Sequence, residues 1–346
     1  DKNDEFNEAC KQQAASFGSE VDGSLYPQRV DLQHLAFCTI DPIDAKDFDD
    51  AIYFDVKERT LYVAIADVSE YVSEYSPIDK EAKFRGFSIY FPHRSVPMLP
   101  RELSENICSL MPNLPRLAFV FKIALDENLN PQKQELFEAI IRSKRRYNYD
   151  EVDEILRTHK ACDLEILSWL LPLNEICERL RRARLKRGFD FRTKELRITL
   201  DEHGFISSTR FETDTPSHKL IEDCMLLANK AAAARIERGV FRNHGSAELK
   251  KIYALLDDLA LFGIDASYQS NLAKMIGEIQ AQADTMGIRE EVDKLIIKAQ
   301  KRAEYASESR GHFGLGFDNY THFTSPIRRY SDLILHRLLK AQMRGD

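Results

Sequence analysis

The sequence predicts an α+β fold in which strands come first along the chain and most helices follow. Between residues 31 and 142, apolar residues occur in short runs or alternate with polar ones, as in β-strands. After Asp150, apolar residues recur at the spacing of amphipathic helices. A block of strands followed by a block of helices is typical of the α+β class.

The N-terminal part of the chain differs from the rest in composition and periodicity. Residues 1–30 are polar, contain Gly18 and Gly23, and show only a short helical stretch. We expect residues 1–30 to be a linker or the end of an upstream region, and residues 31–346 to form the main domain.

Five strands are expected in the first half of the chain. They cover 36–40, 51–56, 61–68, 117–125 and 134–142. Residues 57–60 can connect the second and third strands as a hairpin, and the last two strands can pair across the turn at 126–131. Between them, Pro97 and Pro100 indicate an irregular, extended segment, because proline restricts its own φ angle and the residue before it.

The second half of the chain is expected to be mainly helical. Helical spacing runs from 152 to 180, with Pro172 as a kink or a break. A short hairpin follows at 196–200 and 205–211. Four helical blocks are then expected, at 218–238, 247–262, 271–283 and 289–307. The blocks between residues 239 and 314 carry no evident chemistry and are expected to be scaffold.

Composition and length limit the class of protein. The 346 residues are 43% hydrophobic, enough for a sizeable core. No run of eighteen apolar residues and no signal-peptide pattern is present, so no membrane partner is expected. The six cysteines are scattered without a CxxC pair, which indicates buried thiols and a cytoplasmic location.

One acidic stretch, residues 39–51, lies between two expected strands. It contains Asp41, Asp47, Asp49 and Asp50. Like charges ~4 Å apart repel by roughly 4 kcal/mol at an effective dielectric constant of ~20, so such a cluster takes up protons or binds cations. Oxygen ligands without nearby His or Cys favour Mg²⁺ or Mn²⁺ over zinc. A solvated turn is the other interpretation of the stretch. A calcium loop is disfavoured, because no register supplies both the central Gly and the final Glu.

A further carboxylate, Asp67, ends the third expected strand. It could face the acidic stretch, or it could cap the turn that follows.

Basic residues are concentrated locally although the formal net charge is −7. That charge argues mildly against nucleic acid held on an open surface. The basic runs lie at 142–146, 179–187 and 328–329. A solvated helix face is the alternative interpretation of each run.

The C-terminal region contains a second concentrated signal. A glycine-rich, aromatic segment at 311–317 precedes Ser325 and Pro326, which predict the N-cap and first position of a helix. Arg328 and Arg329 would lie in its first turn. Free N–H groups and two guanidinium groups together predict a phosphate-binding element. The alternative is that the arginines pair with surface carboxylates.

With both signals in place, the chain resembles the RNB catalytic domain of the ribonuclease II and ribonuclease R family, closer to the ribonuclease R type. The resemblance runs from about residue 31 to the C-terminus. The matching motifs are 39–41 with 47–51, 63–69, Tyr90 before 97–100, 103–104, 108–110, 149–150, 221–229, 312–316 and 324–330.

The resemblance implies a fold and an activity. The fold would be a mixed β-sheet on the N-terminal side, surrounded by helices that form a channel to a buried acidic site. The activity would be processive 3′→5′ hydrolysis of single-stranded RNA to nucleoside 5′-monophosphates, dependent on Mg²⁺, in RNA turnover.

The resemblance also implies roles for single residues. Asp41 and Asp50 would hold metal most directly, Asp47 would complete the site, and loss of Asp49 would stop hydrolysis. Arg328 would neutralise charge on the scissile phosphate, with Arg329 beside it as an RNA contact. Tyr90 would stack on the 3′-terminal base, and Tyr149 would contact the RNA near that end.

The chain departs from the family pattern in three places. The OB-type cold-shock and S1 domains that usually flank this domain do not fit within its length, so a catalytic piece of a longer enzyme is expected. The residues around 187–192 and 243–247 differ from the usual continuation, and no base-stacking aromatic is carried over near 247.

Two other functions are kept as alternatives. One is an RNB-like scaffold that binds RNA or protein without hydrolysis; the presence of all four aspartates disfavours it. The other is a two-metal exonuclease acting on DNA, which would need an Asp-x-Glu in a metal-binding context.

Overall fold

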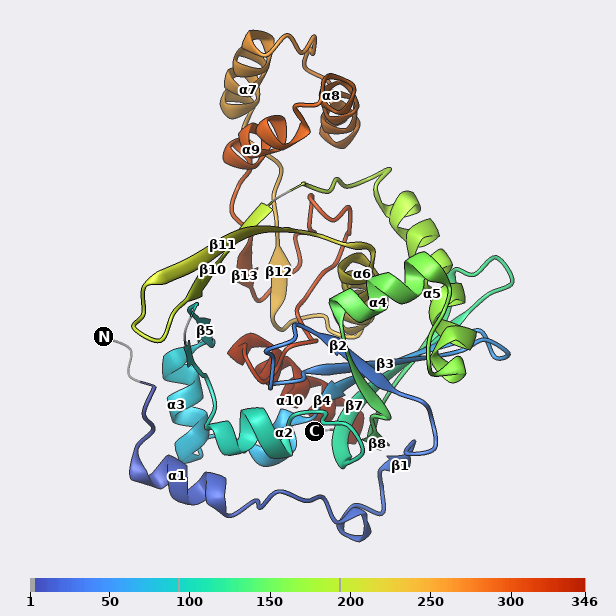
Figure 1. The fold of residues 1–346 in the computed structure, drawn as a ribbon, viewed down its shortest axis with the longest axis vertical. Coiled ribbons are helices and arrows are strands. Elements are labelled where there is room, and N and C mark those ends of the chain that lie inside the picture. Colours follow the sequence, from blue (N-terminus) through green and yellow to red (C-terminus); the bar gives the residue numbers. More distant parts are fainter. Residues whose placement is uncertain (1–3, 93, 193, 346) are drawn as a thin grey trace.

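A seven-stranded mixed sheet forms the centre of the computed structural model, which describes residues 4–92, 94–192 and 194–345 (Figure 1). The strand order is β1-β8-β7-β4-β3-β2-β9. The outer pairs β1/β8 and β2/β9 are parallel, and the pairs between them are antiparallel. The strands are β1 Val30–Asp31, β2 Cys38–Asp41, β3 Asp50–Asp55, β4 Thr60–Ala66, β7 Pro115–Leu125, β8 Pro131–Arg142 and β9 Arg145–Asn148.

All five strands expected in the first half of the chain lie in this sheet. Both expected hairpins, β3/β4 and β7/β8, are present as antiparallel pairs. Strand β9 was missed, because it overlaps the basic run 142–146, for which a solvated helix face was the alternative interpretation. That alternative is wrong for this run, since Arg145 and Arg146 begin an edge strand parallel to β2 in which the next residue, Tyr147, is buried.

The sheet is buried on both faces, because successive residues of a strand point to opposite sides. On one face, residues such as Val63, Ile65 and Phe121 pack with the helices α4 Tyr149–Thr158, α5 Leu164–Arg184 and α6 Pro216–Ala233. On the other face, residues such as Ala64 and Val120 pack with α1 Glu8–Ala15, α2 Val68–Tyr71, α3 Pro77–Arg85 and the π-helical turn Leu103–Ile107. Helix α10, Tyr330–Arg344, contributes to both cores.

Helix α5 continues through Pro172, so of the two expected effects, a kink or a break, the break is wrong. Proline removes one hydrogen bond of the helix. Buried side chains on both sides of it, including Leu170 and Leu173, hold the helix against the sheet.

Three helices form a separate bundle at the top of Figure 1. They are α7 Leu249–Leu261, α8 Leu272–Met286 and α9 Arg289–Ala299, and they have a hydrophobic core of their own. The ribbon of β12 Phe241–Asn243 and β13 Glu304–Ala306 joins the bundle to the rest of the chain. The fourth helical block was expected to reach residue 307; it ends at Ala299, because residues 304–306 pair with β12 instead.

The remaining elements are short. Strands β10 Lys194–Leu200 and β11 Ile206–Thr213 form the expected hairpin. Strands β5 Ile89–Tyr90 and β6 Ser95–Val96 form another hairpin, and a 3₁₀ turn covers Gly23–Leu25.

The N-terminal segment packs on the main domain. Cys10 and Ala14 of α1 are buried in the same core as Ile78 of α3. The side chain of Gln13 accepts a hydrogen bond from the Ile78 N–H at 3.0 Å.

Among the described residues, no helix combines the length and apolar character that crossing a membrane requires. All six cysteines lie in the described part of the chain and are free thiols there. Five are buried as expected, whereas Cys162 is exposed, so the expectation of a buried thiol is wrong for that residue.

Candidate functional site

The acidic loop between β2 and β3 is anchored at both of its ends. The Arg146 guanidinium donates to the carbonyl oxygens of Pro42 and Ile43, each at 2.6 Å. The Ser109 hydroxyl accepts from the Phe48 N–H at 3.0 Å and donates to a loop carbonyl at 2.8 Å. Phe48 itself is buried in the core. The loop is therefore held in one conformation by neighbours from β9 and the segment before β7.

Three of the four predicted aspartates have strongly perturbed carboxyl groups. Burial raises the pKa of Asp50 to about 7, although the charge of Arg328 opposes this shift. Burial, and next the charge of Asp50, raise the pKa of Asp41. Burial raises the pKa of Asp49, which is only 5% exposed, well above its usual range. A solvated turn would not produce these shifts, so the buried acidic site is the better description of the loop.

Asp49 meets the C-terminal arginine segment directly. The Ile327 N–H donates to Asp49 Oδ1 at 2.9 Å, and Arg328 Nε lies 3.6 Å from Asp49 Oδ2. The Arg328 side chain is 45% exposed and also donates to the Ser325 hydroxyl at 2.9 Å. A cationic group thus lies beside the buried carboxylate and is still open to solvent.

The predicted helix start at Ser325 and Pro326 is wrong, because α10 begins at Tyr330. Residues 325–329 form a turn in which the Arg329 N–H donates to the Ser325 carbonyl at 3.0 Å. Two acidic side chains fix the conformation of this turn. The Ser325 N–H donates to the buried Asp332, and the Ile327 N–H donates to Asp49. The N–H groups that were expected to be free at a helix N-terminus are therefore bound within the protein, since the Arg328 N–H also donates to the Ser325 carbonyl at 3.3 Å. The charge offered to a phosphate at this turn comes from the Arg328 side chain.

The two arginines of the turn differ in their surroundings. Arg329 donates to the buried Asp332 at 2.8 Å and is mostly covered, whereas Arg328 remains accessible. The expected alternative, pairing with a carboxylate, therefore holds for Arg329, although its partner is buried.

Tyr90 reaches the acidic loop from the β5/β6 hairpin. Its hydroxyl donates to Asp47 Oδ2 at 2.6 Å, while the residue is 55% exposed. The hairpin is tied to the turn at 325–329, called the arginine turn below. Phe87 forms an antiparallel β-bridge with Arg329, and the Ser88 N–H donates to the Arg328 carbonyl at 3.0 Å. Three segments distant in sequence therefore meet at one place.

Tyr149 approaches the same site from the start of α4. Its ring stacks on His218 of α6, with centroids 3.7 Å apart and planes 17° apart. Burial raises the pKa of Tyr149, and the charges of Asp50 and Asp41 raise it further, so its phenol lies near both carboxylates. One face of the Tyr149 ring is occupied by His218.

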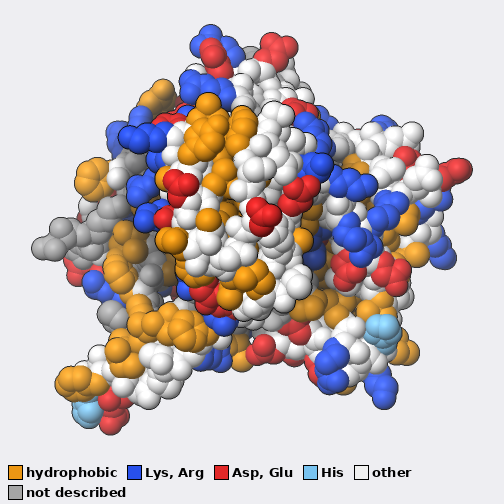
Figure 2. All heavy atoms as spheres, turned by 90° about the horizontal axis from the view of Figure 1, so that it is seen from above, with side chains coloured by type: hydrophobic (Ala, Val, Ile, Leu, Met, Phe, Trp, Pro, Cys, Tyr) orange, Lys and Arg blue, Asp and Glu red, His pale blue; other side chains and the backbone are white. Residues whose placement is uncertain are grey.

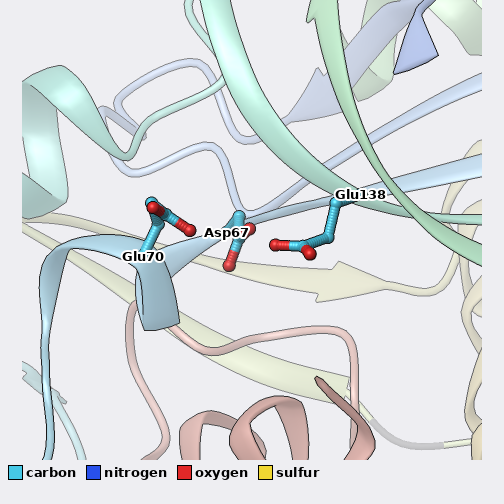
Figure 3. Close-up of side chains that lie close together, drawn as sticks. All are labelled: Asp67, Glu70 and Glu138. Carbon is cyan, nitrogen blue, oxygen red and sulfur yellow. The ribbon is translucent and has the colours of Figure 1, made fainter. Parts of the chain in front are cut away.

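A second group of carboxylates lies away from this loop. Asp67, Glu70 and Glu138 point toward one another in Figure 3, and among the described residues they alone form a group of three potential metal ligands within 4.8 Å. Arg29 lies 2.6, 2.7 and 2.9 Å from these carboxylates, and Lys340 lies 2.7 Å from Asp67 and 2.9 Å from Glu138. A third cation, the exposed Arg344, lies 3.6 Å from Glu138, so three cations balance the three carboxylates. The group is therefore an ion-pair network and not a cation site.

The first expectation for Asp67, that it faces the acidic loop, is therefore wrong. Asp67 occupies the N-cap position of α2, but its side chain makes no capping hydrogen bond to the helix backbone and instead accepts from the Ser69 hydroxyl at 2.7 Å. The pKa of Asp67 is lowered by Lys340 and Arg29 against the opposing effect of burial.

The acidic loop offers a donor set suited to a hard divalent cation. All four of its predicted ligands are carboxylates, and Asp41 Oδ2 is a buried oxygen without a hydrogen-bond partner in the described structure. A divalent cation would satisfy a buried oxygen that accepts no hydrogen bond and lies beside a carboxyl group of raised pKa. The residues present therefore fit such a group.

Sequence reasoning missed several residues that build the site. Ser109 and Arg146 hold the loop, and His218 holds Tyr149. Ser109 lies in one of the matching motifs and Arg146 in a basic run, but no pattern in the sequence shows what either contacts. The Ile327 contribution comes from the backbone and leaves no sequence signal.

Comparison with known proteins agrees with this geometry. The sequence profile of the RNB domain matches residues 29–345. The chain belongs to the RNB domain family.

Relatives of this RNB domain include ribonuclease R of Helicobacter pylori strain J99, 40% identical over 98% of this chain and 53% of the relative. Ribonuclease R of Escherichia coli strain K12 is 36% identical over 96% of this chain and 42% of the relative. The chain spans about half the length of the curated relatives it matches.

Solved structures show the same fold. Mycoplasma genitalium RNase R in complex with ribose methylated single-stranded RNA has a TM-score of 0.90 and 34% identity, over 98% of this chain and 55% of that chain. Yeast Ssd1, a pseudonuclease, has a TM-score of 0.77 at 19% identity and shares the fold. The predicted α+β RNB fold, with a mixed sheet surrounded by helices, is confirmed.

Proposed function

We propose that this RNB domain is a 3′→5′ exoribonuclease that hydrolyses single-stranded RNA processively to nucleoside 5′-monophosphates. The observation that carries the proposal is the contact of the turn at Ile327 and Arg328 with the buried Asp49. It brings a solvent-accessible cation, suited to a phosphate, beside the acidic loop. The family match and the relatives named ribonuclease R support the same activity.

The cation in this proposal is Mg²⁺, with Mn²⁺ as a substitute, held by Asp41, Asp47, Asp49 and Asp50. When bound, it would supply a water nucleophile near neutral pH and stabilise the leaving 3′-oxygen. Its support is the oxygen-only donor set and the orphaned Asp41 Oδ2.

The protein's own residues would bind and orient the RNA. The accessible guanidinium of Arg328 would bind a phosphate oxygen next to Asp49, as a charge-assisted donor. The exposed ring of Tyr90 would stack on the 3′-terminal base, a contact worth ~1–3 kcal/mol. Tyr149, whose ring is held by stacking on His218, would contact the RNA near the same end of the strand.

The acidic net charge does not exclude RNA, because basic side chains are gathered locally. Figure 2, seen from the side of the α7–α9 bundle, shows Lys and Arg side chains grouped on both flanks of the bundle. We propose that residues 31–346 act as the catalytic domain within a longer enzyme that carries flanking RNA-binding domains. A cytoplasmic location is part of the proposal, supported by the six free thiols.

The test uses the purified chain, 5′-labelled poly(A) and a DNA oligomer of corresponding sequence, each with Mg²⁺. We expect the RNA to shorten progressively with release of AMP, the DNA to persist, and EDTA or Asp49→Asn to stop hydrolysis. Bound but intact RNA would instead indicate a catalytically silent scaffold. Equal digestion of the DNA would indicate a two-metal exonuclease without preference for RNA.

A further inference from the structure

Tyr90 makes two separable sets of contacts. Its hydroxyl donates to Asp47 Oδ2 at 2.6 Å, yet 55% of the residue remains exposed. A short hydrogen bond from a phenol to a carboxylate is charge-assisted and stronger than a bond between neutral groups. The base-stacking role proposed above uses the ring and leaves the hydroxyl bond unexplained.

Both partners of this hydrogen bond are fixed independently of it. Asp47 precedes the buried Phe48, whose N–H is bound by Ser109. On the other side, the strand that leads to Tyr90 is tied to the arginine turn by the Phe87–Arg329 bridge and by the Tyr330 N–H, which donates to the Gly86 carbonyl at 2.9 Å. The fold therefore brings the hydroxyl to Asp47, and the bond can set the orientation of the carboxylate.

A hydrogen bond of this kind leaves the carboxylate able to bind a cation. An ionised carboxylate has two oxygens and about four lone-pair directions, so the Tyr90 bond to Oδ2 leaves Oδ1 available. Carboxylates that ligate metals are commonly held by such outer partners, and removal of the partner typically costs 10–100-fold in metal affinity or activity.

We propose that Tyr90 is a positioning residue for Asp47, so that one side chain both orients a cation ligand and presents a ring to the RNA base. The proposal rests on the proposed function, because it takes Asp47 as a ligand of the divalent cation. It adds a task for the hydroxyl that is independent of base stacking.

The experiment separates hydroxyl from ring in the full chain. Mn²⁺ affinity is measured by electron paramagnetic resonance without RNA, and RNA affinity is measured by fluorescence anisotropy in EDTA. We expect Tyr90→Phe to weaken Mn²⁺ binding by about 10–100-fold and to leave RNA affinity in EDTA unchanged. Tyr90→Ala should weaken both. The matched control is Tyr253→Phe on α7, an exposed tyrosine outside the site, which should change neither.

A double-variant cycle tests whether the effect passes through Asp47. If Tyr90 acts on that ligand, Tyr90→Phe should weaken Mn²⁺ binding little further in an Asp47→Asn background. Thermal melting of each variant without Mn²⁺ separates this effect from a loss of folding.

The remaining outcomes overturn the inference in distinguishable ways. Unchanged or tighter Mn²⁺ binding by a folded Tyr90→Phe variant would show that the hydroxyl does not position Asp47, and would leave the proposed function in place. Additive effects in the cycle would show that Tyr90 acts elsewhere. Absence of Mn²⁺ binding by the wild-type chain would overturn the cation site itself and this inference with it.

Discussion

The Ile327 N–H donates a 2.9 Å hydrogen bond to Asp49 Oδ1 across 278 positions of the chain. This bond gives Asp49 a structural task that can be separated from its charge. Asn retains an acceptor oxygen, so we expect Asp49→Asn to keep the fold and RNA binding while hydrolysis of labelled RNA falls by about 10²-fold or more.

Asp49→Leu should be the less stable of the two variants. It removes the acceptor and leaves the buried Ile327 N–H unsatisfied, which costs about 1–3 kcal/mol of unfolding free energy relative to Asp49→Asn. Urea denaturation measures this difference. Equal stability of the two variants would mean that the Ile327 bond contributes little.

The acidic loop should make stability depend on pH and on the cation together. In the unfolded chain these aspartates titrate near pH ~4. In the folded chain the pKa of Asp50 is about 7, and those of Asp41 and Asp49 are raised. The folded state without a cation therefore binds more protons over that window, and its unfolding free energy falls as pH rises from about 4 to 7.

A divalent cation should reverse that loss, because it binds the ionised carboxylates. We expect Mg²⁺ at 100 times its Kd to add about 2.7 kcal/mol of unfolding free energy at pH 8 and clearly less at pH 5. Melting curves at both pH values, with and without Mg²⁺, check this. The control variant is Asp50→Asn, which removes the carboxyl group whose pKa is about 7. An equal effect of Mg²⁺ on the unfolding free energy at pH 5 and pH 8 would contradict the prediction.

Lys340→Met should destabilise the fold without affecting the proposed cation site at the acidic loop. Lys340 is nearly buried and lies 2.7 Å from the fully buried Asp67. Removing one partner of a buried ion pair typically costs about 3–5 kcal/mol, measured here by urea denaturation. Because the pKa of Asp67 is lowered, the stability that the network supplies is present above pH ~4 and is lost as pH falls.

The exposed Lys298 on α9 provides the control, since Lys298→Met should change stability little. Wild-type affinity for Mn²⁺ is expected in Lys340→Met. If Lys340→Met bound one Mn²⁺ ion more than the wild-type chain, the group of Asp67, Glu70 and Glu138 would be a cation site once the ammonium group is removed.

Gly188→Ala should be destabilising because of a close backbone approach. A Cβ at Gly188 would lie 2.6 Å from the Gly314 carbonyl oxygen and 2.8 Å from the Gly316 nitrogen. Forcing extra atoms into such a contact typically costs about 1–3 kcal/mol, which a melting curve detects. Gly277→Ala in α8, where nothing lies within 4 Å, should instead stabilise the chain by about 0.5–1 kcal/mol. Similar effects of both changes would show that the contact at Gly188 can relax.

The sequence anticipated the elements that depend on local periodicity. Strands such as β3 and β4 were predictable because a half-buried or buried strand leaves a short apolar run, and α6 was predictable from its helical spacing. The four aspartates could be selected as a group, since they lie within ten positions of one another.

Elements defined by distant partners were mispredicted. Strand β9 exists because it pairs with β2, and its basic composition conceals this. Residues 304–306 leave helical structure to pair with β12. The turn at 325–329 has Ser and Pro where a helix would begin, but its N–H groups are taken by Asp332 and Asp49. Local propensity was overridden in each case by hydrogen bonds to residues far along the chain.

By itself, the sequence determined the α+β class, the acidic stretch, and the residues suited to bind a cation and a phosphate. Tertiary structure alone decided that Asp67 belongs to an ion-pair network, that Asp49 meets Arg328, and that Tyr90 touches Asp47. The physical reason is that residue type and spacing record which chemistry a side chain can perform. Its pKa, its partner and its exposure arise only when the folded chain removes water and brings distant segments together.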